Sequence, residues 1–424
     1  MTARITNLPA SADLPAGMRV LMDLRPLQEP ERMPITAAYL ERLLAAYVAS
    51  PIESEEFVAI LRTLRPDPTL PLVEAGLEVV ARRWLVPLSR APRTAALAAD
   101  AVQLRLAQIR TSPAADDPVA GTLLHTAGGP VPTAMRLPLV TTLLDLAAWE
   151  LPDRYASSRA ARIVRGLREK ALLAADRVLV GSRATADAAA KLIEIPEERL
   201  VTVPLAADPA FVPAADASSL SRLRAEHGIP ERYLVVGGRF DARSDLATVL
   251  AALGALRNAE PPDDVSPGWP PTLVLIGAVG ADGGARVTKL AERHGVADLV
   301  RLTGPLQPAD HATLTVGAVA HIQPALSDAT GLSALDALAV GVPVIASRTG
   351  PLPEIVGPAG IVVEPSDPAR MAMALRTLWL EGPVATQVRQ AARQRASAPA
   401  RSWADVAHET RKAYESAVQD NAVG

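Results

Sequence analysis

The sequence predicts an α/β protein made of two doubly wound domains. Three observations support this prediction. The chain has 424 residues, which is too long for a single hydrophobic core. Short apolar runs alternate with helical patterns along most of its length, and this alternation indicates parallel sheets covered by helices on both faces. The alternation pauses at a segment rich in proline and small residues, Pro209–Ser221, and then starts again.

The first half begins with an apolar strand and continues with helices and strands in turn. Each predicted strand is a short apolar run, and each predicted helix has the apolar spacing of a helix with one buried face. In chain order, the predicted elements are a strand over 19–24, a helix over 37–47, a strand over 57–61, a helix over 95–109, and strands over 121–125 and 138–143.

The second half repeats the pattern, which predicts a second sheet of the same kind. Its predicted elements are strands over 233–237, 273–277, 300–302, 319–323, 343–346 and 361–363, and helices over 246–256, 285–294 and 332–340. A last helix is predicted over 402–417. We therefore predict domains over 1–212 and 213–400, followed by a terminal segment over 401–424.

Composition excludes several classes of function. Hydrophobic residues make up 49% of the chain and charged residues 21%, as in a folded protein with an apolar core. The net charge of -3 argues against a nucleic-acid partner, because phosphate binding normally requires a basic excess. Cysteine is absent, which excludes disulfides, thiolate metal sites and a cysteine nucleophile. The histidines lack metal-ligand spacing, so we expect neither a metal nor a cofactor.

Targeting signals are also missing from the sequence. The amino terminus is polar, and no apolar run reaches the roughly 18 residues of a membrane span. We expect a cytoplasmic protein without a transmembrane segment. Five residues leave peripheral membrane attachment open, since they read either as a basic membrane-facing patch or as a solvated helix face: Arg82, Arg83, Trp84, Arg90 and Arg93.

The most specific pattern lies between Ile322 and Gly360, where two aspartates, Asp328 and Asp336, are eight positions apart across a helix that starts at Gly331. This segment resembles the donor-sugar site of the family 4 glycosyltransferases, whose usual sequence motif is P-S-x-x-E-G-F-G-L-P-x-L-E-A-M-A-x-G-x-P-V. The chain has aspartate at both glutamate positions. It keeps the frame Pro324, Gly331, Leu332, Ala337, Ala339, Gly341, Pro343 and Val344.

The resemblance extends over most of the chain, through VLMDLRPLQ, ADRVLVGSRATAD, VVGGRFDARSDLATVLAAL and GPLPEIVGPAGIVVEPSD. It implies the GT-B fold, in which two Rossmann-like domains face each other across a cleft and the last helix crosses back to the first domain. It also implies retaining transfer from a nucleoside diphosphate sugar, as the donor substrate, to a carbohydrate or lipid-linked acceptor.

The chemistry of this transfer requires cations and N–H donors at the departing diphosphate. The family supplies an arginine and, five residues on, a lysine; the matching positions are Arg239 and Ser244. The neighbouring Arg243 is either a substitute cation or an exposed loop arginine. A helix that starts at Gly331 and Leu332 would present backbone N–H groups and the positive end of its dipole to a phosphate.

The two acidic positions have separate roles in the resembling family. The second accepts hydrogen bonds from the ribose, which implies nucleotide binding by Asp336. The first contacts the transferred sugar, which makes Asp328 the tentative catalytic residue. A structural alternative stays open for both, with Asp328 as a loop or cap residue and Asp336 as a solvated helix residue.

Several positions depart from the family pattern. The Gly-x-Gly after the first strand is Pro34-Ile35-Thr36, the sugar-contacting histidine is Leu144, and the glutamate of a Ser-Glu pair is Arg183. Thr330 replaces a phenylalanine, and His125 is either a cleft residue or a structural histidine. Two functions therefore remain: a divergent glycosyltransferase, or a catalytically inactive pseudo-glycosyltransferase that acts as a binding, scaffold or regulatory partner of another protein.

Overall fold

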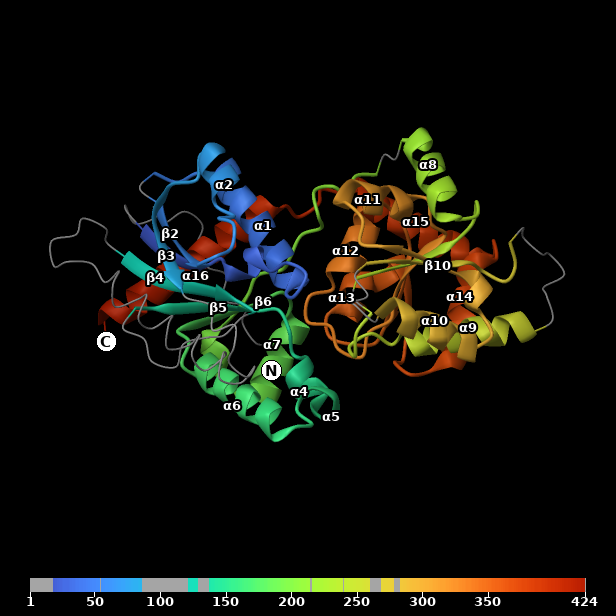
Figure 1. The fold of residues 1–424 in the computed structure, drawn as a ribbon, viewed down its shortest axis with the longest axis horizontal. Helices are drawn as coiled ribbons and strands as arrows, with labels where there is room; N and C mark the ends of the chain where they lie inside the picture. The colour runs from blue at the N-terminus through green and yellow to red at the C-terminus, as the bar shows by residue number, and fades with distance from the viewer. Residues whose placement is uncertain are drawn as a thin grey trace. The chain divides into compact units, whose positions relative to one another are not determined.

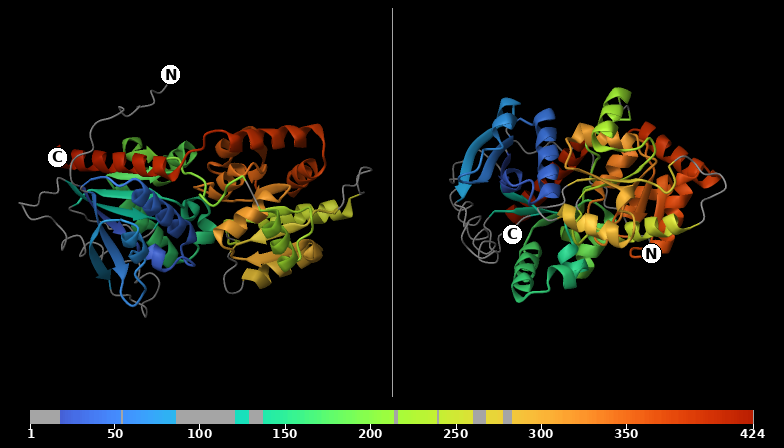
Figure 2. Two further views of the ribbon diagram at one scale, coloured as in Figure 1. Left: turned by 90° about the horizontal axis from the view of Figure 1, so that it is seen from above. Right: turned by 45° about the vertical axis from the view of Figure 1, so that its right-hand side comes forward.

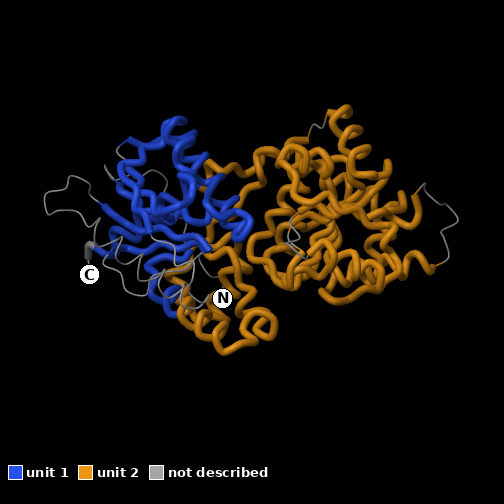
Figure 3. Tube along the Cα trace, viewed as in Figure 1, with its two compact units in different colours: residues 1–142, 170–178, 407–424 blue, residues 143–169, 179–406 orange. Residues whose placement is uncertain are grey.

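The protein was analysed as a computed structural model that describes residues 18–53, 55–85, 121–128, 137–213, 216–238, 240–259, 268–277 and 283–423. Two compact units emerge from its contacts (Figure 3). Unit 1 combines 1–142 with 170–178 and 407–424, and unit 2 combines 143–169 with 179–406. Each unit is therefore assembled from segments that are far apart in the sequence.

The first sheet has seven strands in the order β3-β2-β1-β4-β5-β6-β7 (Figure 1). Its strands are β1 (Met18–Asp23), β2 (Glu55–Arg62), β3 (Val79–Leu85), β4 (Gly121–Ala127), β5 (Leu139–Leu143), β6 (Arg177–Val180) and β7 (Leu200–Thr202). The pairs β1–β2, β1–β4, β2–β3 and β4–β5 are parallel. The order reverses direction at β1 and β4, so the carboxyl ends of these two strands form a topological switch point.

The helical segments between these strands vary in length. They are η1 (Arg25–Gln28), α1 (Pro34–Ala49), α2 (Leu70–Glu74), α4 (Ala147–Glu150), α5 (Pro152–Tyr155), α6 (Arg159–Leu173), α7 (Arg183–Ile193) and η2 (Glu197–Arg199). Ser182 caps α7 by accepting a hydrogen bond from the Thr185 backbone N–H at 3.0 Å.

The second sheet has six strands in the order β10-β9-β8-β11-β12-β13. They are β8 (Leu234–Gly237), β9 (Leu273–Ile276), β10 (Val300–Gly304), β11 (Ala320–Gln323), β12 (Val344–Ser347) and β13 (Gly360–Val363). All their pairs are parallel.

Helices cover both faces of this second sheet (Figures 1 and 2). On one face, alternate strand residues such as Val236, Leu275 and Ile322 pack against α9 (Leu246–Asn258), α10 (Gly283–Arg293) and α14 (Pro368–Trp379). The intervening residues face the other layer. That layer consists of α8 (Ala217–His227), α11 (Pro308–Val316), α12 (Leu332–Ala339), α13 (Leu352–Val356) and α15 (Pro383–Ser397). Short η3 (Ala297–Leu299) and η4 (Gly357–Ala359) complete the unit.

The last helix, α16 (Trp403–Val423), packs within unit 1 through a buried polar network. The Tyr47 hydroxyl donates to the Tyr414 hydroxyl at 3.1 Å, and Tyr414 bonds His125 Nδ1 at 2.7 Å. Arg411 forms a buried two-point ion pair with Glu55 at 2.6 and 2.9 Å. Buried polar groups require such partners, so α16 is part of the core of this unit.

The doubly wound architecture that the sequence predicts is confirmed. All seven strands of the first sheet precede residue 203, and all six of the second follow residue 233. The predicted boundary between residues 212 and 213 lies between the two sheets and stays a prediction.

One of the two interpretations of Arg82, Arg83 and Trp84 is wrong. They do not lie on a solvated helix face, because they belong to β3, at one edge of the sheet. Their β-branched neighbours Val79 and Val80 favour a strand, and pairing with β2 fixes it. The predicted helix over 95–109, Arg90 and Arg93 lie outside the described residues.

Candidate functional site

The candidate site is the loop that joins β11 to α12 in unit 2. Its last residue, Gly331, has φ of 63° and precedes the first helical residue, Leu332. A Cβ at Gly331 would lie 2.3 Å from Ile355 Cδ1, so a larger residue would displace the end of this side chain, and the positive φ favours glycine. Sequence and structure agree on this helix start.

Asp328 organises the loop with both of its carboxylate oxygens. Oδ1 accepts the backbone N–H groups of Thr330 at 2.9 Å and Gly331 at 2.8 Å, while Oδ2 accepts the Gln323 side-chain amide at 3.0 Å. Asp328 is therefore a loop residue, one of the structural roles that the sequence left open. A carboxylate offers about four acceptor positions, so Oδ2 retains capacity for one more donor beyond its bond to Gln323.

A buried histidine contacts the glutamine that bonds Asp328. His321 on β11 is 1% exposed, and burial lowers its pKa to about 4. Its Nε2 lies 3.3 Å from Gln323 Oε1, and Gln323 in turn bonds Asp328. The neutral imidazole thus fixes the orientation of the amide that holds Asp328.

Asp336 lies about one turn into α12, on its buried face. It is 8% exposed, so it is not the solvated residue considered as its structural alternative. Its Oδ1 accepts the backbone N–H of Asp208 at 2.7 Å, which ties the segment after β7 to α12. The carboxylate is therefore held in place by backbone of its own unit.

The loop after β8 holds the position where the family has lysine. Ser244 bridges to Ala325 in the Asp328 loop, so it lies next to the candidate site. Arg243 does not serve as an unpaired cation: its guanidinium bonds Asp241 at 2.7 Å and Asp145 at 2.9 Å. Burial would lower the pKa of Arg243, but these two carboxylates outweigh it and raise that pKa. Arg239 lies outside the described residues.

A carboxyl group that sequence reasoning did not identify approaches the same loop. Glu150 at the end of α4 accepts a hydrogen bond from the Ser327 hydroxyl, next to Asp328. Burial raises the pKa of Glu150, and the charges of Asp145 and Asp328 raise it further, against the Ser327 bond. The sequence signal was weak, because α4 has only four residues.

The positions that depart from the family pattern lie in both units. Leu144 belongs to unit 2 and is 3% exposed. Thr36 lies in the first turn of α1 in unit 1 and is 6% exposed. His125 is a structural histidine: it is fully buried, its Nε2 bonds Thr142 Oγ1 at 2.9 Å, and burial lowers its pKa to about 3. Arg183 is exposed at the start of α7.

Metal and membrane features complete the description. Across the described ranges, no group of three or more His, Asp or Glu side chains is placed to hold a metal ion. Within the same ranges, every helix is too short or too polar to cross a bilayer.

Comparison with solved structures identifies the fold class. Sucrose-phosphate synthase from Thermosynechococcus elongatus superposes on the chain with a TM-score of 0.69, covering 96% of this chain and 100% of that one at 20% identity. Together with two parallel, doubly wound sheets, this likeness defines a GT-B fold.

Comparison of sequences finds a matching family model over part of the chain. Residues 221–395, which include the whole candidate loop and α12, match the family model of the glycosyl transferases group 1. This part of the chain is thus similar to the glycosyl transferases of that group. It is 28% identical to O-antigen chain mannosyltransferase B of Escherichia coli over 281 residues, covering 65% of this chain and 70% of that protein.

A second relative matches a shorter part. D-inositol 3-phosphate glycosyltransferase of Corynebacterium jeikeium (strain K411) is 33% identical over 177 residues, which cover 40% of this chain and 41% of the relative. The chain thus aligns with less than half the length of that protein.

Proposed function

We propose that the chain transfers a sugar from a nucleoside diphosphate sugar to a carbohydrate or lipid-linked acceptor, with retention of configuration. The observation that carries the proposal is the Gly331 turn. It starts α12 in a left-handed conformation that favours glycine, inside the region that matches the family model. The turn supports diphosphate binding, because backbone N–H groups and the dipole at a helix start favour an anion.

The side chains around the turn support binding of the remaining parts of the donor. Asp328 keeps acceptor capacity on Oδ2 for one sugar hydroxyl, and its hydrogen bonds fix the direction of that oxygen. We assign the nucleotide side of the site to Asp336, Leu332 and Ser244, and the cation to Arg239. Both relatives described above are named as glycosyltransferases, which supports transfer over scaffolding alone.

Calorimetric titration of the full chain with UDP, GDP and their common sugar conjugates tests the proposal. We expect saturable binding of one nucleotide class, lost in Arg239→Ala and kept in Arg222→Gln, an exposed arginine on α8. Absence of binding at millimolar ligand would reject the transferase and favour the pseudo-glycosyltransferase.

A gain-of-function variant sharpens this test. Ser244→Lys restores a cation beside the Asp328 loop, where Arg243 is already neutralised by Asp145 and Asp241. Donor turnover should rise by about 10²-fold if the lysine acts as a preorganised transition-state donor. A Ser244→Met variant controls for side-chain length without charge, and an equal effect of both variants would contradict the electrostatic role.

A further inference from the structure

A line of polar side chains runs along β11 into the loop that carries Asp328. His321 and Gln323 are two positions apart on this strand, so their side chains lie on the same face of the sheet. Gln323 Oε1 lies 3.3 Å from His321 Nε2, and Gln323 Nε2 donates to Asp328 Oδ2 at 3.0 Å. We call the side chains of His321, Gln323 and Asp328 the β11 network.

The chemistry of the three groups fixes the position of each hydrogen in the β11 network. A carboxylate only accepts hydrogen bonds, so the NH2 group of Gln323 faces Asp328 and its Oε1 faces His321. Because Oε1 also only accepts, the proton of the neutral imidazole lies on Nε2. Burial lowers the pKa of His321 to about 4, which keeps the ring neutral at neutral pH. The network therefore donates in one direction, from the ring to the carboxylate.

The same tautomer leaves the other ring nitrogen as an acceptor only. His321 Nδ1 is buried, and no hydrogen-bond donor reaches it among the described residues. A buried acceptor without a donor costs stability, and an apolar side chain at this place on the strand would avoid that cost. Packing alone therefore does not account for an imidazole here, whereas its Nε2 bond to Gln323 does.

The neighbouring strand leaves space for the ring. β8 pairs with β11 in the register Val236–Ile322, and Gly237 follows at the end of β8. A Cβ at Gly237 would lie 3.0 Å from His311 Nε2 and 3.3 Å from His321 Cε1, which is closer than ordinary van der Waals contact. Glycine at this position thus gives the imidazole of the β11 network its room.

The network determines which oxygen of Asp328 remains for a ligand. Oδ1 accepts the backbone N–H groups of Thr330 and Gly331, and the Thr330 hydroxyl lies 3.3 Å from it. Oδ2 accepts the amide of Gln323 and, within the described ranges, no other donor. An ionised carboxyl oxygen has about two acceptor positions, so Gln323 leaves one of them on Oδ2 and sets its direction.

We propose that Gln323 and His321 are positioning residues for the transferred sugar: Gln323 holds Asp328 Oδ2 in the orientation that accepts a sugar hydroxyl, and His321 acts through Gln323. This inference deepens the proposed function and rests on it. Neither side chain is assigned to the nucleotide, so the sugar and the nucleotide parts of the donor should respond differently when these residues are replaced.

Calorimetric titration of the full chain tests the role of Gln323. UDP-glucose, UDP-N-acetylglucosamine and GDP-mannose are each compared with their nucleoside diphosphate, and the measured quantity is the ratio of the two dissociation constants, sugar conjugate to diphosphate. For the conjugate that the wild type binds most tightly, Gln323→Met should raise this ratio about tenfold, because a misplaced carboxylate loses its hydrogen bond to the sugar. An unchanged ratio would overturn the proposal.

A set of variants tests whether His321 acts through Gln323. His321→Met removes the Nε2 donor and should raise the ratio about threefold, the effect of one neutral hydrogen bond. His321→Gln keeps an N–H donor and should restore most of the wild-type ratio. The double variant His321→Met/Gln323→Met should match Gln323→Met alone, whereas additive effects would contradict action through Gln323.

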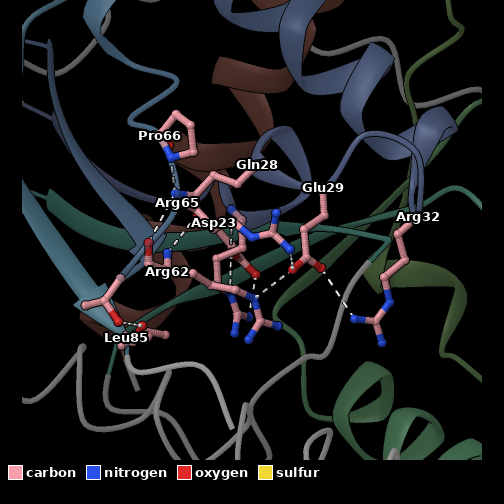
Figure 4. Close-up of polar contacts among 10 residues, drawn as sticks. Asp23, Gln28, Glu29, Arg32, Arg62, Arg65, Pro66 and Leu85 are labelled. Carbon is pink, nitrogen blue, oxygen red and sulfur yellow. Dashed lines mark hydrogen bonds and ion pairs between the residues drawn. The ribbon is translucent and has the colours of Figure 1, made fainter. Parts of the chain in front are cut away.

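The matched control is Gln28→Met in unit 1. Gln28 is 9% exposed and is bonded at both ends of its amide. It accepts the Arg62 backbone N–H at 2.7 Å and donates to the carbonyls of Arg62 at 3.2 Å and Pro66 at 2.9 Å (Figure 4). The same substitution there removes a bonded glutamine outside the Asp328 loop, so the ratio should not change. An equal rise in the Gln28 and Gln323 variants would overturn the positioning role.

Nitrogen NMR of histidine-labelled protein, without nucleotide, tests the hydrogen positions directly. The resonances of His321 are those that disappear in His321→Gln. We expect a neutral ring protonated on Nε2 at neutral pH, with Nδ1 bare. A ring protonated on Nδ1 would be unable to donate to Gln323 and would overturn the proposal.

Nucleotide binding separates this inference from the proposed function. If UDP or GDP binds alike to the wild type and to Gln323→Met while the ratio rises, both proposals hold. If the nucleotide binds and the ratio stays constant, only the positioning role fails. If no nucleotide binds to the wild type, the glycosyl transfer fails and the positioning role fails with it.

Discussion

Asp328 and Asp336 illustrate at the residue scale what a side chain shorter by one methylene does to this site. Both carboxylates accept backbone N–H groups of their own unit, from Thr330 and Gly331 in one case and from Asp208 in the other. They hold the loops that frame α12. Any donor must therefore bind to a site whose acidic groups are already positioned and partly occupied.

Gly331 gives the first prediction at this scale. Gly331→Ala places a Cβ 2.3 Å from Ile355 Cδ1 and forces a left-handed backbone on alanine. We expect a loss of about 1–2 kcal/mol in unfolding free energy from the backbone alone, together with loss of nucleotide binding. Urea unfolding and calorimetry measure the two effects.

The control for this variant is Gly166→Ala. Gly166 lies inside α6, and a Cβ there meets nothing within 4 Å. Alanine should stabilise that helix by about 0.5–1 kcal/mol. Equal effects of the two substitutions would contradict the special role of the Gly331 turn.

His125 predicts a dependence of stability on pH. Its folded-state pKa is about 3, against 6.5 for the unconstrained side chain, so between these values the unfolded chain binds a proton that the native chain does not. Stability should therefore fall as pH decreases from 6.5 to 3, by about 1.4 kcal/mol per pH unit for this one group.

The measurement is urea unfolding at several pH values in the wild type and in His125→Gln. The variant should show a shallower fall over this window, because it removes one proton from the unfolded state. His321, whose pKa is lowered to about 4, stays in both proteins and cancels in the comparison. An unchanged slope would show that His125 is protonated in the native state.

At the scale of elements, α16 completes unit 1 through a buried ion pair. Arg411 bonds Glu55 at two points and the Ser50 carbonyl at 2.9 Å, and its guanidinium stacks over Tyr47 with 4.5 Å to the ring centroid. Arg411→Met should cost about 3–5 kcal/mol, because it leaves the Glu55 carboxylate buried without its partner.

The double variant Glu55→Gln/Arg411→Met separates charge from packing. It removes the unpaired charge as well, so it should recover much of the stability that Arg411→Met loses. Thermal unfolding of the three variants and the wild type provides the full cycle. A double variant no more stable than Arg411→Met would show that packing of the arginine over Tyr47 dominates.

At the scale of the whole molecule, the two units predict separate responses to truncation. A chain that ends at residue 402 lacks α16, which supplies Tyr414 and Arg411 to unit 1. In calorimetry, the transition of unit 1 should be lost or shifted far downward, while that of unit 2 should stay. A uniform shift of a single transition would indicate that the units unfold together.

The fold was largely predictable from the sequence, because buried parallel strands are continuous apolar runs. The runs at 57–61, 273–277 and 319–323 became β2, β9 and β11 within a few residues. β3 was missed because Arg82, Arg83 and Trp84 interrupt its apolar character at the sheet edge.

The candidate site was only partly predictable. A local pattern located the Gly331 turn, since turn and helix start are adjacent in sequence. The partners that define the site are remote: Asp336 bonds a residue 128 positions away, Ser327 bonds one 177 positions away, and Arg243 pairs across 98 positions. Such pairings depend on tertiary packing, and no periodicity or motif in a single sequence encodes them.

The position of α16 also has a consequence for biosynthesis. Glu55 and His125 leave the ribosome early, but their partners Arg411 and Tyr414 follow the entire core of unit 2. During translation, unit 2 can complete its contacts while Glu55 still lacks Arg411 and His125 Nδ1 still lacks Tyr414. The unit whose synthesis begins first is thus completed last.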